Sequence, residues 1–300
     1  MNLTESILSY RQYLKRKNYS KHTIRNYLHR LQSFLVWIAV PVEAVRPVDV
    51  NYYIEYLMEK RLSAETINAH LVVIRRFYSY LGDEEEIEID NPAVEGIALR
   101  LPKPLPRHLR DNDLATFFEV VHKSRDMAMF VLMLRCGLRV EEVANLTLAA
   151  IDYKRHQVLV RNGKGAKDRV VYLSDDAANT LAVYLRSRPQ TTEKHIFLVE
   201  KGPHKGKVIS VRGIQKRIEY YSKKSGTSVS CHKLRHTMAT QLLNAGAGLV
   251  TIQNLLGHSR IKTTMRYCKL SNLKAEREYH EAVAKILIKS GITLAGNLRC

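Results

Sequence analysis

The strongest limit on the fold is a stretch, about a third of the way along the chain, that no continuous helix can cross. Residues 83–95 hold seven acidic side chains and no basic one, and prolines occupy positions 102, 104 and 106. Proline lacks a backbone N–H and clashes with the preceding helical turn. A chain of 300 residues is also about twice the length of a common single domain. We therefore predict two domains at residues 1–82 and 111–300, joined by a linker at 83–110.

The first domain is predicted to be helical and to contain an internal repeat. The pattern S-x-x-T-I begins at Ser20 and recurs at Ser63, and the apolar residues that follow keep the same spacing in both copies. Serine is a favoured helix N-cap, and apolar residues three or four positions apart form one face of a helix. The expected helices, four in all, cover residues 4–16, 20–38, 47–59 and 63–81.

The second domain is predicted to be mostly helical with one small sheet. Two β-branched runs, residues 156–161 and 169–173, flank a turn that contains glycines, as in a β-hairpin. No glycine-rich loop of the kind that binds ATP or NAD follows a strand, so no cofactor is expected. Helices are expected at residues 111–121, 125–135, 175–187, 211–224, 232–244, 248–256 and 272–289.

The net charge of +19 indicates a polyanionic partner, and its distribution is uneven. Residues 1–100 contain 13 basic and 13 acidic side chains, whereas residues 101–300 contain 35 basic and 16 acidic ones. The longest apolar run, residues 127–134, is far shorter than the roughly twenty residues that span a bilayer. With no secretory leader at the N-terminus, we expect a cytoplasmic protein that binds nucleic acid and no membrane.

Neither disulfides nor a metal centre are expected. The four cysteines lie far apart and form no Cys-x-x-Cys spacing. His232 and His236 are one helical turn apart, as zinc ligands can be, but no third ligand stands at a suitable spacing.

Two segments of the second domain contain residues suited to holding a phosphate. Arg139 and Glu142 lie within one helical turn just past Gly137. A guanidinium pairs with phosphate oxygens, and a carboxylate at that spacing can orient it. Lys164, in the turn of the hairpin, can contact a phosphate or donate a proton. Taken alone, Arg139 and Glu142 are also consistent with a salt bridge on the surface. Lys164 taken alone is consistent with an exposed turn that only aids solubility.

Two later segments add a set of residues suited to nucleophilic chemistry. His232 and Arg235 share one face of a predicted helix, His258 stands at a turn, and Tyr267 follows nine residues later. A tyrosine hydroxyl, with a pKa of about 10, must be activated by cations or a base before it attacks. Any one of the sixteen tyrosines is also consistent with a role in core packing or in stacking on nucleic-acid bases.

In this order, the residues resemble the tyrosine recombinase family, of the phage integrase and Xer type. The matching motifs are G-L-R-x-x-E at 137–142, G-K-G-x-K-x-R at 163–169, H-x-L-R-H-T-x-A-T at 232–240 and L-L-G-H-S…T-T-x-x-Y at 255–267. Cys231 stands where the family usually has proline, and Lys269 where it often has histidine. Neither position is catalytic, but both weaken an assignment to the housekeeping Xer subgroup.

The resemblance implies a fold and a reaction. The fold is mainly α, with an N-terminal SAM-like four-helix core-binding domain that binds DNA and a mostly helical catalytic domain with a small β-sheet. Tyr267 would attack a DNA phosphodiester, form a 3′-phosphotyrosyl link and allow strand exchange through a Holliday junction, without metal or ATP. The implied catalytic residues are Arg139, Lys164, His232, Arg235, His258 and Tyr267, with Glu142 in support.

The resemblance also implies partners. These are a double-stranded DNA recombination site and a homotetramer on paired sites, with a related recombinase or accessory proteins as further candidates. The helix after the nucleophile, with Ala282, Val283, Ile286 and Leu287 on one face, is expected to dock onto a neighbouring protomer. A type IB topoisomerase and a non-catalytic DNA-binding protein of the same fold are the alternative functions. Dimer resolution, cointegrate resolution and phage integration all use this residue set.

Overall fold

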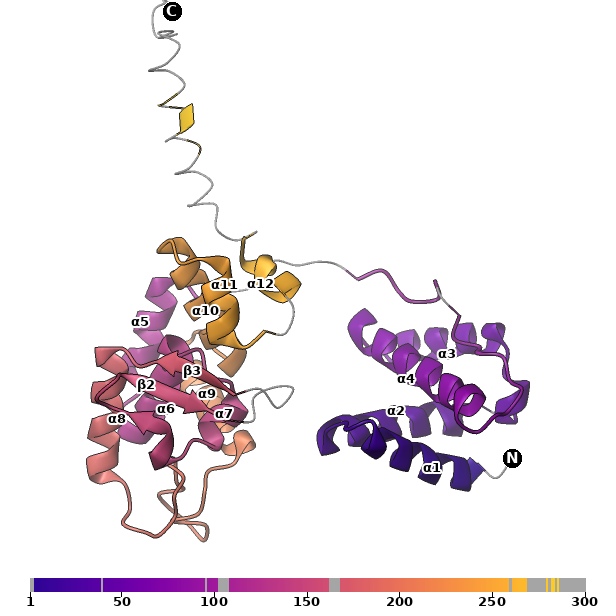
Figure 1. Cartoon of the computed structure of the whole chain (residues 1–300), viewed down its shortest axis with the longest axis horizontal. Coiled ribbons are helices and arrows are strands. Elements are labelled where there is room, and N and C mark those ends of the chain that lie inside the picture. Colours follow the sequence, from indigo (N-terminus) through magenta and orange to yellow (C-terminus); the bar gives the residue numbers. More distant parts are fainter. Residues whose placement is uncertain are drawn as a thin grey trace, which may run out of the picture. The chain divides into compact units, whose positions relative to one another are not determined.

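The chain forms two compact units, Met1–Lys103 and Pro104–Cys300 (Figure 1). The computed structural model describes residues 3–38, 40–94, 96–101, 108–161, 168–258 and 261–268, and positions 279, 282, 283 and 285. Within these residues, no helix has both the length and the apolar character that crossing a membrane requires.

The first unit is a bundle of four α-helices, as predicted. They are α1 (Leu3–Arg16), α2 (Lys21–Trp37), α3 (Pro47–Glu59) and α4 (Ala64–Asp83), with a short 3-10 turn at Val42–Ala44. Ser20 caps α2, where its Oγ accepts from the Thr23 N–H at 3.1 Å. Ser63 caps α4 in the same way, from the Thr66 N–H at 3.3 Å. The two copies of the sequence repeat are therefore the second and fourth helices of the bundle.

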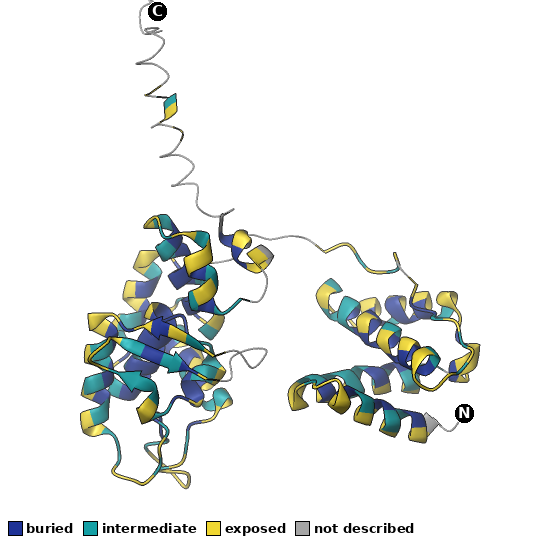
Figure 2. Ribbon diagram, viewed as in Figure 1, coloured by how far each residue is buried: buried dark blue, intermediate teal, exposed yellow. Residues whose placement is uncertain are grey.

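Aromatic rings fill the core of the first unit. Each helix turns one buried face inward and leaves the other exposed (Figure 2). Tyr10 packs edge-on against Phe77, with ring centroids 5.3 Å apart, and Phe34 meets Tyr53 in the same manner at 5.0 Å. All four rings are fully buried, so they fix how the helices pack.

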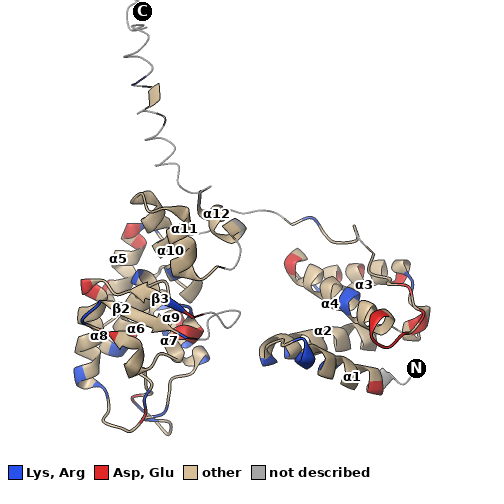
Figure 3. Cartoon of the chain, in the orientation of Figure 1, with Lys and Arg blue, Asp and Glu red and all other residues tan. Residues whose placement is uncertain are grey.

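The segment after α4, which the sequence assigned to the linker, packs onto α4 as far as residue 99. The Arg75 side chain donates to the carbonyl oxygens of Ala93 at 2.7 Å and Val94 at 2.8 Å. Asn68 exchanges two hydrogen bonds with the backbone of Leu99, each 2.8 Å long. Apolar side chains that alternate with the acidic ones pack against the bundle core, while the acidic groups gather on the surface after α4 (Figure 3).

The second unit is mostly helical around one small sheet, which confirms the predicted fold class. Its helices are α5 (Asp111–Glu119), α6 (Ser124–Arg135), α7 (Val140–Ala144), α8 (Asp175–Ser187), α9 (Val211–Ser225), α10 (Cys231–Asn244), α11 (Leu249–Leu256) and α12 (Ile261–Cys268). The strands β1 (Ile151–Asp152), β2 (Gln157–Val160) and β3 (Arg169–Tyr172) form an antiparallel sheet in that order. Val158 faces Val171 across β2 and β3, and both valines are fully buried.

Near the C-terminus, the structure contains one helix that was not predicted, and one predicted helix lies almost entirely outside the described residues. Helix α12 was not predicted, and it carries Tyr267. The predicted helix at 272–289 lies outside the described residues except at the four isolated positions given above, so the expected apolar face at Ile286 and Leu287 also lies outside them.

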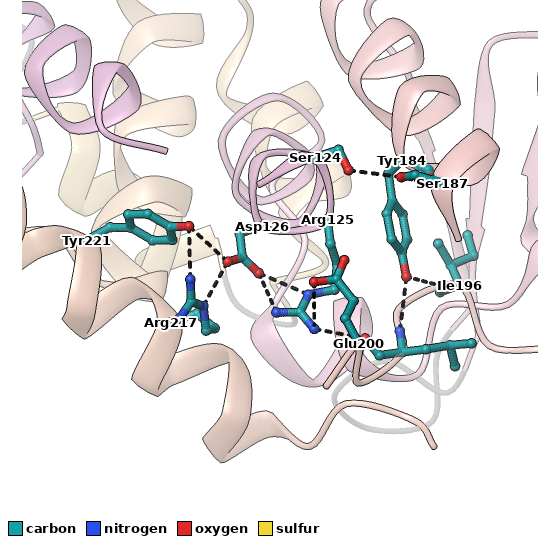
Figure 4. A network of polar contacts seen from close by, with 10 residues as sticks. Ser124, Arg125, Asp126, Tyr184, Ser187, Ile196, Glu200, Arg217 and Tyr221 are labelled. Carbon is teal, nitrogen blue, oxygen red and sulfur yellow. Dashed lines mark hydrogen bonds and ion pairs between the residues drawn. The ribbon is translucent and has the colours of Figure 1, made fainter. Parts of the chain in front are cut away.

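A buried polar network ties α6 to α9 (Figure 4). The Asp126 carboxylate is fully buried and accepts from Arg125 at 2.8 Å and from Arg217 at 2.7 Å. Tyr221 donates to the same carboxylate at 3.1 Å, and Arg125 also donates to the carbonyl of Leu198 at 3.0 Å. A buried carboxylate with this many donors holds its neighbours in one arrangement, because an unpaired charge there is costly.

Helices α10, α11 and α12 lie together at one end of the second unit (Figure 1). Their shared core contains Met238, Leu243, Ile252, Leu256 and Tyr267. Strand β3 contacts α11. Arg139, just before α7, donates to the carbonyl of Leu256 at the end of α11, so these described segments meet at this end.

Candidate active site

Arg139 is positioned by the start of α7. It is the residue immediately before the helix, and its backbone N–H and its Nη1 both donate to the Glu142 carboxylate, at 2.7 and 2.8 Å. The preceding turn depends on Gly137, which has a φ of +62° and where a Cβ would lie 3.1 Å from the sulfur of Met238. The Arg139 and Glu142 pair expected from sequence is therefore a half-buried structural unit rather than a surface salt bridge.

Arg169, at the start of β3, is the second cation on Glu142. Its two terminal nitrogens donate to the two carboxylate oxygens, each at 2.7 Å, in the bidentate geometry typical of strong arginine pairs. Burial alone would raise the pKa of the Glu142 carboxyl. The hydrogen bonds from Arg169 and from the Arg139 backbone, with the Arg169 charge, outweigh burial and lower that pKa to about 2. Arg169 belongs to the G-K-G-x-K-x-R motif, and no role was predicted for it.

The last carbonyl groups of α11 accept hydrogen bonds from three guanidinium groups. Arg169 Nε donates to Leu255 at 2.9 Å, and Arg139 Nη2 donates to Leu256 at 3.1 Å and to Gly257 at 3.2 Å. Arg235 also donates to Leu256. The C-terminal end of a helix carries partial negative charge, so it holds the three cations together. Gly257 ends the helix in the left-handed conformation, with a φ of +58°.

Arg235 is the most deeply buried of these cations. Its side chain lies on α10, is 5% exposed and donates to the carbonyl groups of Gly137 and Leu256. Burial and the neighbouring charge of Arg139 lower the pKa of Arg235 to about 9, which leaves the guanidinium charged at neutral pH. Arg139 and Arg235, predicted from separate motifs, therefore meet on one carbonyl group.

His258 follows Gly257 and faces the same cluster of cations. Burial, and then the charges of Arg235 and Arg139, lower the pKa of His258 to about 4. Its imidazole is therefore neutral at physiological pH. Its Nδ1 lies 3.0 Å from Oγ1 of Thr264, on α12, a buried residue that sequence analysis did not single out.

Tyr267 is buried on α12 and is 2% exposed. Its hydroxyl lies 2.5 Å from Nδ1 of His236, a residue of the H-x-L-R-H-T-x-A-T motif for which no catalytic role was predicted. His232, one turn earlier on α10, is exposed, and its ring stacks on that of His236 with centroids 6.2 Å apart. The available signal for His236 was the second histidine of H-x-L-R-H, directly after Arg235.

The structure brings most of the predicted set to one end of the second unit. Arg139, Glu142, Arg235, His258 and Tyr267 all belong to α7, α10, α11, α12 or their adjoining turns, and His232 lies at the exposed edge. Lys164 lies outside the described residues. Phosphate oxygens pair well with converging guanidinium groups.

Comparison with known proteins identifies the family. Residues 107–274 match the phage integrase family, and residues 7–85 match the phage integrase N-terminal SAM-like domain. The tyrosine recombinase XerA of Thermococcus kodakarensis is 30% identical over 292 residues, which cover 94% of this chain and 98% of the relative. The tyrosine recombinase XerC of Leptospira interrogans is 33% identical over 299 residues, 94% of each chain.

Solved structures share the fold. The Tn1549 transposon integrase in complex with transposon right end DNA has a TM-score of 0.77 at 18% identity and covers 93% of this chain and 99% of its own. A λ integrase dimer bound to a COC′ core site has a TM-score of 0.74 at 15% identity, over 89% of this chain and 95% of its own. The matches confirm the resemblance drawn from the motifs: the chain belongs to the phage integrase family and is a tyrosine-type site-specific recombinase.

Proposed function

We propose that this recombinase cuts and rejoins DNA at a specific site through a covalent bond between Tyr267 and a 3′ phosphate. The observation that carries the proposal is the joint attachment of Arg139, Arg169 and Arg235 to the end of α11, in the same helical cluster as the tyrosine. Cleavage would expel a 5′-hydroxyl. Attack by the 5′-hydroxyl of a second strand would then reseal the backbone, and two such exchanges proceed through a Holliday junction.

The arginines supply the main electrostatic contribution. Arg139 and Arg235 bind the non-bridging oxygens of the scissile phosphate and offset the charge that develops as the tyrosine attacks. Such preorganised donors are usually the largest single term in catalysis. Glu142 and the carbonyl groups at the end of α11 hold the arginines before DNA binds, so little reorganisation is needed during the reaction.

The remaining members of the set move protons or contact the phosphate. Lys164 donates a proton to the departing 5′ oxygen as general acid. His232, at the exposed edge of the site, and His258, which is neutral at physiological pH, donate hydrogen bonds to the phosphate. The proposed reaction consumes no nucleotide, because the covalent bond conserves the energy of the phosphodiester. It needs no metal ion, because the arginines supply the positive charge at the phosphate.

The two units take separate roles in this proposal. Residues 1–82 form the core-binding domain and residues 111–300 the catalytic domain, and the segment between them joins the two. The similarity of residues 7–85 to the integrase SAM-like domain supports the first assignment. Four protomers act on paired sites in the cytoplasm, and the helix that bears Ala282 and Val283 docks onto a neighbour.

Covalent capture tests the proposal. The protein is mixed with a library of nicked duplexes of random sequence, and complexes that survive denaturation are recovered. Wild type and a matched Tyr220→Phe control, altered at an exposed ring of α9, are expected to form the adduct, and Tyr267→Phe is expected to form none. An adduct of undiminished yield in Tyr267→Phe would refute the assignment of the nucleophile.

Product analysis separates the alternative functions. Plasmids that carry two copies of the recovered site are incubated with wild-type protein, and the products are sorted by topology. Exchanged strands and junction intermediates are expected from a recombinase. Relaxed circles alone would indicate topoisomerase activity, and site-specific binding without any adduct would indicate a non-catalytic DNA-binding protein.

A further inference from the structure

The hydroxyl of Tyr267 contacts a histidine that the motif analysis left without a catalytic role. His236 Nδ1 lies 2.5 Å from Tyr267 Oη, whereas His258 Nδ1 is paired with Thr264 Oγ1 at 3.0 Å. His232 is exposed and stacks on the outer side of His236. We propose that His236 accepts the phenolic proton of Tyr267 when the tyrosine attacks DNA, an inference that rests on the proposed function.

The fold holds the two rings in place from both sides. His236 lies in the middle of α10 and Tyr267 on α12, and these helices pack against each other. The ring centroids are 5.6 Å apart and the rings are tilted by 55°, so the edge of the imidazole points at the hydroxyl. Because neither ring lies on a loop, the contact is a property of the helix packing.

The proposed step moves one proton and exchanges one bond at phosphorus. The Oη–H bond of Tyr267 breaks, the proton passes to His236 Nδ1, and an Oη–P bond forms while the bond from phosphorus to the 5′ oxygen breaks. Lys164 supplies the proton for that oxygen in the proposed mechanism. An imidazole that accepts at Nδ1 carries its own proton on Nε2. In the rejoining step the imidazolium returns its proton to Tyr267 as the Oη–P bond breaks.

A phenol is a much weaker acid than an imidazolium, with ordinary pKa values of about 10 and 6.5. The proton therefore moves as the Oη–P bond forms, which is general-base catalysis. Within the described part of the chain, the titratable and charged groups near His236 include His232 and Arg235 on α10, His258 after α11, and Tyr267 on α12. All of them are retained in a variant of His236, so the ratio of wild-type to variant rate isolates its contribution.

Two substitutions separate proton acceptance from simple positioning. His236→Asn places an amide oxygen near the position of Nδ1, which keeps a hydrogen-bond acceptor for Tyr267 but removes the base. His236→Ala removes both. The probe is a nicked duplex recovered by covalent capture with wild-type protein, and the measured quantity is the rate of adduct formation at saturating enzyme. His122→Asn, at an exposed site before α6, is the matched control, and thermal melting of each variant reports its folding.

At pH 7 both variants are expected to lose roughly 10²- to 10⁴-fold in rate, the range typical of general-base catalysis. The deficit should shrink as the pH rises toward the ordinary pKa of a phenol, because the tyrosine then ionises without help. A duplex with sulfur in place of the bridging 5′ oxygen has a leaving group that needs no proton. It is expected to rescue Lys164→Ala but not His236→Asn.

The outcomes that overturn the inference differ from those that overturn the proposed function. If wild-type protein forms no adduct with any duplex, both fail. If wild type forms the adduct and His236→Asn matches its rate, His236 only positions the tyrosine and the inference alone fails. A faster rate in His236→Ala, or a deficit that does not change with pH, would likewise overturn it.

Discussion

Glu142→Gln tests whether the arginine cluster is held by a buried charge or only by shape. Glutamine keeps the size of the side chain and removes its negative charge. The pKa of Glu142 falls from 4.5 to about 2 in the folded chain, and tenfold in an equilibrium constant is worth about 1.4 kcal/mol, so the ionised form contributes about 3 kcal/mol to stability. The Glu142 side chain is 7% exposed, so solvent screening does not reduce this figure much.

The sign of the pH dependence follows from the lowered pKa. A carboxyl whose pKa is lower in the folded state stabilises the fold above pH 4.5, and this contribution is lost as the pH falls from 4.5 through 2. The gap between wild type and Glu142→Gln is therefore expected to be about 3 kcal/mol at pH 7 and only about 1 kcal/mol at pH 3. Glu141→Gln, at an exposed neighbouring carboxylate, should change stability by no more than about 0.5 kcal/mol.

The chain offers a way to read each unit separately during urea unfolding. Its single tryptophan, Trp37, ends α2 in the first unit, so tryptophan fluorescence follows that unit alone. Far-ultraviolet circular dichroism follows the helices of both. Glu142→Gln should shift the dichroism transition and leave the fluorescence transition unchanged. A gap below about 1 kcal/mol at pH 7, or one that stays constant down to pH 3, would show that the carboxylate does not hold the arginines by charge.

Three further changes have expected outcomes that the same measurements check. Asp126→Ala should cost the second unit about 3 to 5 kcal/mol, because it removes the buried carboxylate that two arginines share and leaves Arg125 only the more distant Glu200, at 3.7 Å; a loss near zero in urea unfolding would contradict this. Gly257→Ala places a side chain on a residue with a φ of +58° and brings its Cβ to 3.0 Å from Arg169 Cδ. It should lower the stability of the second unit by about 1 to 2 kcal/mol and slow adduct formation. An unchanged rate of adduct formation would mean that Arg169 does not need its present position. Burial lowers the pKa of His70 from 6.5 to about 4, so the first unit should lose up to about 3 kcal/mol as the pH falls from 6.5 to 4. Trp37 fluorescence reports that loss of stability, and His70→Gln should abolish the pH dependence. A wild-type unfolding midpoint that does not change between pH 6.5 and 4 would refute the prediction.

Local sequence signals predicted the helices well where capping and apolar spacing agree. The two copies of S-x-x-T-I gave the starts of α2 and α4 because a serine cap acts within a single turn. Helix α12 escaped prediction because its sequence is rich in threonine and charged residues, and its inward face includes a buried polar residue, Thr264. Its helical form depends on packing against α10 and α11, which sequence periodicity does not register.

The sequence motifs named most residues of the candidate site, but they did not predict which of these residues contact each other. Motif order identified Arg139, Glu142 and Tyr267, but the bidentate pairing of Arg169 with Glu142 joins β3 to α7 across the fold. The choice between His232 and His236 as the neighbour of the tyrosine depends on where α12 lies. Both contacts are long-range in sequence, so neither spacing nor residue type reveals them.

The joint attachment of three guanidinium groups and one carboxylate has an electrostatic consequence for the proposed reaction. Arg139, Arg169 and Arg235, taken with Glu142, leave the described part of the site with two uncompensated positive charges. A phosphodiester in its ground state neutralises one of them. The five-coordinate phosphorus formed by attack of the tyrosine carries a second negative charge and neutralises the other. The described part of the site is therefore matched in charge to the transition state rather than to the bound substrate, which is the condition under which binding energy accelerates a reaction.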